Sequence, residues 1–431
     1  MKFFKEKNVM SKFETISVIG LGYIGLPTAA AFAQHGVNVI GVDVNQRAVD
    51  TINQGKIHIV EPELDIAVHE CVAKGTLKAT MVPEPADAFL IAVPTPFKGS
   101  NYEPDLSYIE AASKAIASVL KKGDLVILES TSPVGATEQM SEWLAKARPD
   151  LTFPQQTGEN SDIRIAHCPE RVLPGQVMRE LTENDRIIGG ITLKCSKQAV
   201  SLYKIFVKGD CIITNARTAE MCKLTENSFR DVNIAFANEL SIICDKLNIN
   251  VWELISLANR HPRVNILQPG CGVGGHCIAV DPWFIVNKTP DLAKLIHTAR
   301  LVNDGKPEWV INKVNDAVIE ALQKNPNKTL SDIKIACLGL AFKPDIDDLR
   351  ESPALKITEQ LAEKYPNQLL AAEPNIEALP EKLTAKNIKH SSLSQALEAS
   401  DVLVVLVDHK EFKEIQTASV NAVVVDTKGI W

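Results

Sequence analysis

The chain has 431 residues, of which 45% are hydrophobic and 23% are charged, and its formal net charge is −7. This length exceeds one ordinary hydrophobic core and predicts two or three domains, while the negative charge argues against a general binder of nucleic acids or anionic membranes. The nine cysteines are odd in number and scattered, and no apolar run of the sequence reaches the ~18 residues of a membrane span. We therefore expect a cytoplasmic protein with neither nucleic-acid nor membrane partners.

The first predicted elements form a β-loop-α-β unit. Residues 15–19 are a short β-rich run, and residues 20–25 then read Gly-Leu-Gly-Tyr-Ile-Gly, the fingerprint of a dinucleotide-binding loop. An alanine-rich helix is predicted over residues 27–34 and a second strand over residues 37–42. Asp43 follows at the distance where a carboxylate binds the ribose hydroxyls of NAD and repels the 2′-phosphate of NADP. The unit therefore predicts NAD as the cofactor.

Later segments repeat this plan. Buried strands are predicted at residues 88–93 and 125–128, and the C-terminal part of the chain has matching runs at residues 333–338, 401–407 and 422–425. In open α/β sheets, ligands bind at the carboxyl ends of such strands. The predicted fold class is α/β, with two doubly wound, Rossmann-like domains.

The second copy differs from the first in its loop. Residues 339–344 read Gly-Leu-Ala-Phe-Lys-Pro, so that Ala341 replaces the middle glycine and Lys343-Pro344 replaces the start of a helix. A second dinucleotide is therefore not expected, and a single phosphorylated ligand is expected there instead.

A long helix is predicted between the two halves, because residues 218–247 contain no proline or glycine and carry apolar residues at helical spacing. Its apolar residues lie on more than one side, which favours a homodimer. The resulting domains are an N-terminal NAD-binding domain at residues 1–213, a central helical domain at residues 214–328 and a C-terminal domain at residues 329–431.

A cysteine motif occupies residues 269–282. Cys277 lies among glycines and is followed four residues later by Asp281. Glycines let the backbone approach a substrate closely, and a thiol in such a turn is presented as a nucleophile. Together with a nicotinamide, the thiol suggests oxidation of an alcohol through a thioester to an acid. Cys271 is a rival nucleophile, and the alternative for Cys277 itself is a small buried hydrophobic residue.

Polar residues on the long helix join this chemistry. Lys223, Asn227 and Arg230 are spaced to share one helical face, although a solvated polar stripe would look the same. Asp281 and Lys223 are both candidates for the base that takes the hydroxyl proton. Lys223 and Asn227 are candidates to stabilise the oxyanion that thiol attack creates, and the Lys223 cation would favour the thiolate.

Two histidines near the motif receive other interpretations. We interpret His276 as a packing or sugar-binding residue rather than a general base. Metal catalysis is not expected, because His261, His276 and Cys277 lack compact ligand spacing. Residues 1–10 carry no motif that we can interpret.

The chain resembles the UDP-sugar 6-dehydrogenase family over residues 16–431. The segments that carry the resemblance are residues 20–25, 93–96, 129–135, 169–171, 223–230, 274–281 and 342–353. The resemblance implies oxidation of the C6 alcohol of a UDP-hexose to a carboxylate with two NAD per sugar. His276 and Val280 replace the serine and lysine of the UDP-glucose branch and resemble the branch acting on N-acetylated UDP-hexosamines, UDP-N-acetyl-D-mannosamine above all. UDP-N-acetylglucosamine and UDP-glucose are the alternative substrates.

The resemblance also implies roles for individual residues. Glu170 would be the base that activates the hydrolytic water, with Thr131 helping to hold that water. The implied cofactor-binding residues are Gly20, Gly22, Tyr23, Ile24, Gly25, Asp43, Arg47, Thr95 and Thr131. The implied substrate-binding residues are Arg171, Val172, Lys223, Asn227, Arg230, His261, Arg263, Gly274, Phe342, Lys343, Arg350 and Lys428.

Two of these residues also have an interpretation without a role in binding. The resemblance implies a biosynthetic pathway as well. Arg350 with Glu351 would also fit a surface ion pair, and Lys428 would fit a solvated turn. The resemblance implies a surface-glycan pathway such as enterobacterial common antigen or capsule.

Two other functional classes compete with this prediction. A two-electron dehydrogenase with an idle thiol would form one NADH per sugar and would survive Cys277→Ala. A NAD-sensing or scaffold protein would keep the fold without catalysis, but the presence of Lys223, Asn227, Cys277 and Asp281 argues against it.

Overall fold

The computed structural model describes residues 13–59, 61–99, 101–173, 175–275, 277–416 and 420–431. His276 and the N-terminal residues 1–10 lie outside this description. The chain divides into two compact units, Met1–Glu226 and Asn227–Trp431, and the boundary falls within helix α9 (Ala216–Leu247). The predicted long helix is confirmed and begins two residues earlier than expected. The boundaries of the three predicted domains stay a prediction.

The first unit is built on a β-sheet. Its strands are β1 (Thr15–Ile19), β2 (Asn38–Val42), β3 (Leu77–Thr80), β4 (Ala88–Ile91), β7 (Leu125–Leu128), β8 (Arg164–His167), β9 (Arg186–Gly190) and β10 (Cys211–Asn215). In the described residues they form one eight-stranded sheet in the order β10-β9-β8-β7-β4-β1-β2-β3. Neighbouring strands are parallel except β8 and β9. This order confirms a doubly wound domain, because the chain winds outward from β1 to both edges.

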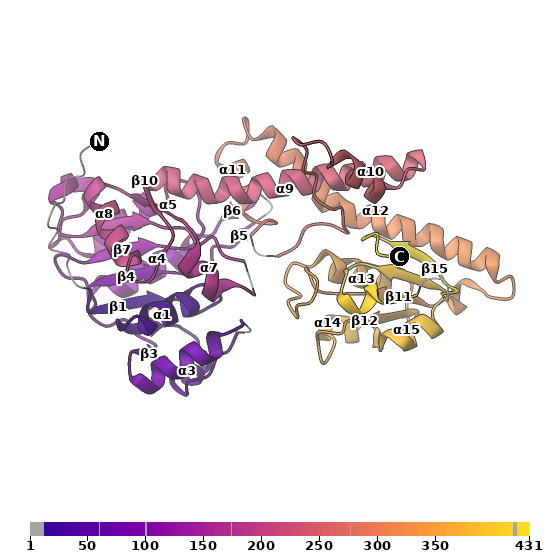
Figure 1. Ribbon diagram of the computed structural model, residues 1–431, viewed down its shortest axis with the longest axis horizontal. Helices are drawn as coiled ribbons and strands as arrows, with labels where there is room; N and C mark the ends of the chain where they lie inside the picture. Colours follow the sequence, from indigo (N-terminus) through magenta and orange to yellow (C-terminus); the bar gives the residue numbers. More distant parts are fainter. Residues whose placement is uncertain (1–12, 60, 100, 174, 276, 417–419) are drawn as a thin grey trace. The chain divides into compact units, whose positions relative to one another are not determined.

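Helices cover both faces of this sheet (Figure 1). The α-helices of the first unit that precede α9 are α1 (Gly25–Gln34), α2 (Gln46–Asn53), α3 (Leu64–Lys74), α4 (Ser107–Ala117), α5 (Ala136–Ala147), α6 (Pro154–Thr157), α7 (Val177–Glu183) and α8 (Leu193–Tyr203). Alternate side chains of a strand point to opposite faces, so Leu125 and Ile127 enter the core with α1 and α8, whereas Val126 and Leu128 enter the core with α4 and α5. A short hairpin, β5 (Phe97–Lys98) with β6 (Glu103–Pro104), follows β4.

The second unit holds the other predicted doubly wound sheet. Its strands are β11 (Ile335–Leu338), β12 (Leu369–Ala372), β13 (Lys389–His390), β14 (Val402–Val405) and β15 (Val423–Asp426). Among the described residues they run parallel in the order β13-β12-β11-β14-β15. Ile335 and Cys337 enter one core, and Ala336 and Leu338 enter the other. The helices after β11 are α13 (Pro353–Lys364), α14 (Glu381–Thr384), α15 (Leu393–Ala399) and α16 (Lys410–Lys413).

A helical segment of the second unit precedes this sheet and consists, after α9, of α10 (Val251–Ala258), α11 (Asp281–Lys288) and α12 (Lys294–Lys324). A buried polar network joins α12 to α9. Arg300 Nη1 donates to Asp231 at 2.6 Å, and Asn303 donates to Asp231 at 2.8 Å. Asn238 donates to Asn303 and accepts the N–H of Gly270, both at 2.9 Å, so the network also fixes the start of the cysteine motif. No helix among the described residues has the length and apolar character needed to cross a membrane.

Candidate active site

The glycine-rich loop between β1 and α1 has the geometry that a dinucleotide requires. Gly20 has a φ of +92°, and a Cβ on Gly25 would lie 1.8 Å from the Gly20 carbonyl oxygen, so the loop closes tightly onto the first turn of α1. A Cβ on Gly22 would meet no atom within 4 Å, which leaves room for a ligand at the backbone. The first turn of α1 contains no acidic residue to oppose phosphate binding at the helix N-terminus.

Asp43 supports this loop from the end of β2. Its Oδ2 accepts the N–H of Leu21 at 2.9 Å, and its Oδ1 accepts the N–H of Asn45 at 2.9 Å. The carboxylate is only half-buried, so it is still accessible to ribose hydroxyls. Two other residues expected at the cofactor, Tyr23 and Arg47, are exposed.

Thr95 follows β4, at the same edge of the sheet as the loop. Its Oγ1 is buried and has no hydrogen-bond partner among the described residues. A buried hydroxyl without a partner is costly, which is typical of a position that a ligand completes. Together with the open backbone at Gly22 and the accessible Asp43, this hydroxyl fits NAD; Ile24, the residue before α1, is half-buried.

A buried group of charged residues lies where β7 and β8 end. Glu170 is 7% exposed, and its Oε2 accepts from Arg186 Nη1 of β9 at 2.7 Å. Glu129 is 2% exposed, and its Oε1 accepts the Tyr203 hydroxyl of α8 at 2.6 Å. Burial raises the pKa of Glu129 to about 7. The positive charge of Arg186 opposes this increase, and the negative charge of Glu170 adds to it. Thr131, two residues after Glu129, is half-buried.

Sequence reasoning assigned no role to three members of this group. Glu129 belongs to a segment that carries the family resemblance, but nothing in its spacing indicates that it is buried beside Glu170. Arg186 and Tyr203 carry no sequence signal beyond an arginine at the start of an apolar strand and an aromatic residue at the end of a helix. The guanidinium lies over the Tyr203 ring at 4.9 Å, which assembles the group.

Arg171 and Val172 follow Glu170. Arg171 forms an ion pair with Glu226 at 2.7 Å and donates to the Asp185 carbonyl at 3.2 Å. Val172 is half-buried against the core. The two positions expected to contact substrate are therefore anchored by the first unit itself.

The second unit brings Cys277, Asp281 and Asn227 together. Cys277 is exposed, and its carbonyl accepts the N–H groups of Val280 and Asp281 at 3.1 and 2.8 Å, in the turn that leads into α11. Asp281 is 3% exposed, and its Oδ2 accepts from Asn227 Nδ2 at 2.5 Å. The arrangement places an exposed cysteine in the turn that precedes α11, and the carboxylate at the start of that helix is oriented by an amide.

The glycines of the motif are explained by packing within the second unit. A Cβ on Gly274 would lie 2.5 Å from the Glu351 carbonyl oxygen, and one on Gly272 would lie 3.0 Å from Pro353. Gly275 has a φ of +83° and lies against the Phe342 ring. The motif thus packs against the loop that follows β11, whereas the sequence alone suggested only close approach to a substrate.

Cys271, the rival nucleophile, is 7% exposed. Its thiol donates to the Leu406 carbonyl at 3.5 Å. Burial raises the pKa of Cys271 to about 11, so the neutral thiol dominates at physiological pH. The structure therefore favours Cys277 over Cys271 as the nucleophile.

The cations expected at the phosphates have individual settings. Arg350 forms an ion pair with Asp348 at 2.6 Å. Lys428 pairs with Asp408 at 3.1 Å and is not merely a solvated turn residue. Lys343 is exposed.

Four further residues predicted to bind the substrate lie on α9 or shortly after α10. Arg230, His261 and Arg263 are exposed, and Lys223 on α9 is half-buried. Within the part of the chain that the structure describes, no ion pair involves these four side chains. Their roles stay predictions.

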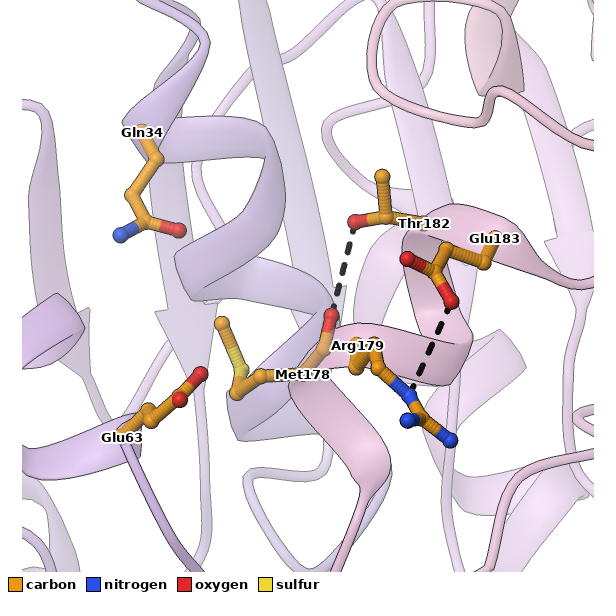
Figure 2. A pocket seen from close by; sticks show the side chains of 6 residues that line it. All are labelled: Gln34, Glu63, Met178, Arg179, Thr182 and Glu183. Carbon is orange, nitrogen blue, oxygen red and sulfur yellow. Dashed lines mark hydrogen bonds and ion pairs between the residues drawn. The ribbon is translucent and has the colours of Figure 1, made fainter.

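A surface hollow of about 280 Å³ is lined by six residues, none of which belongs to the groups described above (Figure 2). Gln34, one of its lining residues, is the last residue of α1, so the length of this ten-residue helix, about 15 Å, separates it from the glycine loop. Three of its side chains make local contacts, since Arg179 pairs with Glu183 at 3.7 Å and Thr182 donates to the Met178 carbonyl at 3.4 Å. The hollow therefore has no part in the candidate site. Its lining residues are Gln34, Glu63, Met178, Arg179, Thr182 and Glu183.

Three domains of the UDP-glucose/GDP-mannose dehydrogenase family match the chain: the NAD binding domain over residues 14–207, the central domain over residues 217–305 and the UDP binding domain over residues 336–431. The chain is similar to a UDP-N-acetyl-D-mannosamine dehydrogenase of Campylobacter jejuni, with 69% identity over 412 residues, 95% of this chain and 99% of the relative. A UDP-N-acetyl-D-mannosamine dehydrogenase of Yersinia pestis is 67% identical over 420 residues, 97% of this chain and 99% of the relative. The solved structure of a UDP-D-ManNAc dehydrogenase from Pyrococcus horikoshii is similar with a TM-score of 0.86 at 40% identity, covering 97% of this chain and 96% of that one.

The fold and the site define an NAD-binding α/β oxidoreductase. The chain belongs to the UDP-glucose/GDP-mannose dehydrogenase family. It is therefore a dehydrogenase with NAD as its cofactor, and its C-terminal domain is the UDP binding domain of the family. The predicted family, fold class and cofactor are confirmed.

Proposed function

We propose that the protein oxidises C6 of UDP-N-acetyl-D-mannosamine to the carboxylate of UDP-N-acetyl-D-mannosaminuronate, with two NAD per sugar. The observation that carries the proposal is the exposed Cys277 in the turn before α11, where Asn227 orients the carboxylate of Asp281. The names of the similar proteins from Campylobacter jejuni and Yersinia pestis support the sugar. A thiol so placed serves an oxidation that continues past the aldehyde.

The first step converts the C6 alcohol to an aldehyde. Bound NAD supplies the hydride acceptor for this oxidation and for the next one. Gly20, Gly22 and Gly25 would hold its pyrophosphate and Asp43 its ribose. The other residues that would complete the binding site are Tyr23, Ile24, Arg47, Thr95 and Thr131. Asp281 takes the hydroxyl proton, because the amide of Asn227 fixes its carboxylate. Lys223 remains the alternative base.

The second step is covalent. The sulfur of Cys277 bonds to the aldehyde carbon, and the carbonyl oxygen becomes an oxyanion that Lys223 and Asn227 stabilise. Loss of a hydride from this thiohemiacetal carbon restores the carbonyl and leaves a thioester. The Cys277 carbonyl accepts the N–H groups of Val280 and Asp281, which fixes the backbone of the turn that carries the thiol.

The last step is hydrolysis. Glu170 takes a proton from water held by Thr131, the water oxygen bonds to the acyl carbon, and the carbon–sulfur bond breaks to return the Cys277 thiolate. Arg186 supports this role, because its guanidinium holds Glu170 in place at 2.7 Å. The base is therefore positioned before the thioester forms.

The uridine diphosphate and the sugar are proposed to bind through a larger set of residues. Cations serve the phosphates, because guanidinium and ammonium groups donate to anionic oxygens. Phe342 and Gly274 lie in the contact between the cysteine motif and the loop after β11, which supports a role for that loop beside the reacting carbon. The full set is Arg171, Val172, Lys223, Asn227, Arg230, His261, Arg263, Gly274, Phe342, Lys343, Arg350 and Lys428.

A homodimer is proposed from the exposed apolar residues of α9. Phe229 and Phe236 are 68% and 51% exposed, and Ile243 and Leu247 continue the same repeat. An apolar stripe of this kind is typical of a helix that packs against a second subunit. We also propose a cytoplasmic location and a role in supplying a surface polysaccharide, such as enterobacterial common antigen or capsule.

A substrate panel tests the proposal. Purified protein is given UDP-N-acetylmannosamine, UDP-N-acetylglucosamine or UDP-glucose, and NADH is counted per sugar consumed. The expected result is preference for UDP-N-acetylmannosamine with two NADH per sugar. One NADH per sugar with an active Cys277→Ala variant would replace the proposal by a two-electron dehydrogenase, and binding of both ligands without NADH would indicate a non-catalytic NAD sensor.

A further inference from the structure

The buried group at the ends of β7 and β8 contains two carboxylates, of which Glu170 is bonded to the Arg186 guanidinium and Glu129 to Tyr203, the residue whose ring that guanidinium covers. Strands β7 and β8 are parallel neighbours with Leu128 opposite His167, so the residues that follow them enter the same edge of the sheet. Glu170 receives Arg186 Nη1 at 2.7 Å, while Glu129 receives the Tyr203 hydroxyl at 2.6 Å. The Arg186 guanidinium also lies over the Tyr203 ring, 4.9 Å from its centroid, so Tyr203 contacts both Glu129 and Arg186.

The hydrogen bonding of Glu129 is incomplete. Its Oε2 is buried and has no hydrogen-bond partner among the described residues. A buried carboxylate oxygen without a donor is costly when charged, and the cost is removed when it carries a proton. The surroundings of Glu129 therefore favour its protonated form, whereas Glu170 forms an ion pair with Arg186.

We propose that Glu129 is a positioning residue for thioester hydrolysis: by competing with Glu170 for the charge of Arg186, it sets how strongly Glu170 attracts the proton of the attacking water. This inference rests on the proposed function. Glu129 touches neither substrate nor water in this role. It acts through Arg186. When Glu129 is protonated, the positive charge of Arg186 stabilises the negative charge of Glu170 alone. When Glu129 is ionised, the same positive charge stabilises both carboxylates.

The groups that face Glu129 determine its titration. Arg186 comes from β9, Tyr203 from α8, and Cys168 and Glu170 from the segment that follows β8. Burial raises the pKa of Cys168 to about 12, so this thiol stays neutral throughout the neutral range. Burial also raises the pKa of Glu129 to about 7, which places its change of charge near neutral pH.

The expected consequence is a pH dependence of hydrolysis. Loss of the proton from Glu129 adds a negative charge to the group, weakens the hold of Arg186 on Glu170 and makes Glu170 a stronger base. Decay of the acyl-enzyme therefore accelerates as pH rises through about 7. Glu129→Gln, which keeps a neutral side chain of the same size, removes this acceleration.

Single-turnover measurements test the inference. The acyl-enzyme is formed by rapid mixing with UDP-N-acetylmannosamine and NAD, and its decay is followed by quenching and mass spectrometry from about pH 5.5 to 8.5. We expect the wild-type decay to rise about tenfold across this range and that of Glu129→Gln to stay within about twofold. A wild-type profile in Glu129→Gln would overturn the inference.

Tyr203→Phe is the matched second variant. The Tyr203 hydroxyl stabilises the charged form of Glu129, so its removal shifts the midpoint of the decay profile to higher pH. This variant decides the matter if Glu129→Gln fails to fold, and an unshifted midpoint would contradict the inference. Failure of the proposed function is distinguishable, because in that case no acyl-enzyme forms in the wild type at any pH.

Discussion

The two Rossmann-like sheets each place an acid after their second strand, and the two acids do different work. Asp43, after β2, is half-buried and holds its loop through one backbone N–H, which leaves the carboxylate accessible to a ribose. Glu373, after β12, is 2% exposed and accepts the N–H groups of Leu340 and Ala341 at 2.7 and 3.1 Å and His409 Nε2 at 3.0 Å. In the second sheet the carboxylate makes its hydrogen bonds within the protein and is buried, so it is not accessible to a ribose. The same topology therefore does not give the same ligand.

The loops before these acids differ in the same sense. Gly25 lets α1 begin directly at the first loop, which places a helix N-terminus at the phosphates. The corresponding position in the second sheet is Pro344, and the next helix begins only at Pro353. The difference teaches that a glycine and an accessible acid, rather than the order of strands, select the dinucleotide.

The largest expected effect comes from the first loop. Gly25→Ala places a Cβ 1.8 Å from the Gly20 carbonyl oxygen, so the loop must shift. We expect NAD binding to be lost and the free energy of unfolding to fall by about 1–3 kcal/mol. Calorimetric titration with NAD and thermal unfolding measure the two effects.

Gly22→Ala is the matched control, because its Cβ meets no protein atom within 4 Å. We expect an unchanged Tm but a Kd for NAD raised at least about tenfold, since the methyl group occupies space needed by the pyrophosphate. Wild-type NAD affinity in Gly22→Ala would show that the first loop does not bind the pyrophosphate.

The two acids give the next largest effect. Asp43→Asn should raise the Kd for NAD about tenfold and reduce discrimination against NADP, because a carboxylate no longer meets the ribose. Glu373→Gln should leave the Kd for NAD unchanged and lower the free energy of unfolding by about 1–3 kcal/mol, because it disturbs a buried hydrogen-bonded group. If Glu373→Gln weakened NAD binding, the two sheets would not be functionally distinct.

The contributions of Glu373 and Glu129 to the stability of the fold should change with pH in opposite directions. Burial alone would raise the pKa of Glu373, but the hydrogen bonds from His409 and Leu340 lower it to about 2 from its ordinary value of 4.5. Glu373 therefore stabilises the fold above pH 4.5 and loses this effect as pH falls towards 2. Glu129, whose pKa is raised to about 7, stabilises the fold fully below pH 4.5 and loses this effect as pH rises through 7.

Denaturant unfolding across this pH range checks both signs. Glu373→Gln should flatten the acid side of the stability profile, and Glu129→Gln should flatten the decline towards neutral pH. Each effect is on the order of 3 kcal/mol at most, from the size of the pKa shift. Equal slopes in a variant and the wild type would show that the substituted carboxyl does not control that limb.

The smallest expected effect on stability is at Arg350. Its ion pair with Asp348 is 46% exposed on the arginine side, and such surface pairs contribute about 0–1 kcal/mol. Arg350→Ala should therefore leave the Tm nearly unchanged while raising KM for the UDP-sugar about tenfold. An unchanged KM would leave Arg350 as a surface ion pair, the bland alternative.

Much of the fold was predictable because local patterns and topology agree. The glycine loop with Asp43, the long helix and the repeated strands are each written in contiguous residues, and the structure has all of them. The group of Glu129, Arg186 and Tyr203 was not predictable, because its members come from three elements and meet only after the sheet forms. The role of Glu373 was likewise hidden, since its burial depends on His409 of a distant segment.

The most direct test of the covalent chemistry is mass spectrometry of Glu170→Gln incubated with UDP-N-acetylmannosamine and NAD. Loss of the hydrolytic base should trap the acyl group, so the peptide that contains Cys277 is expected to carry the mass of the oxidised UDP-sugar. Two NADH should form per adduct. Formation of NADH without any adduct on Cys277 would contradict catalysis through a thioester.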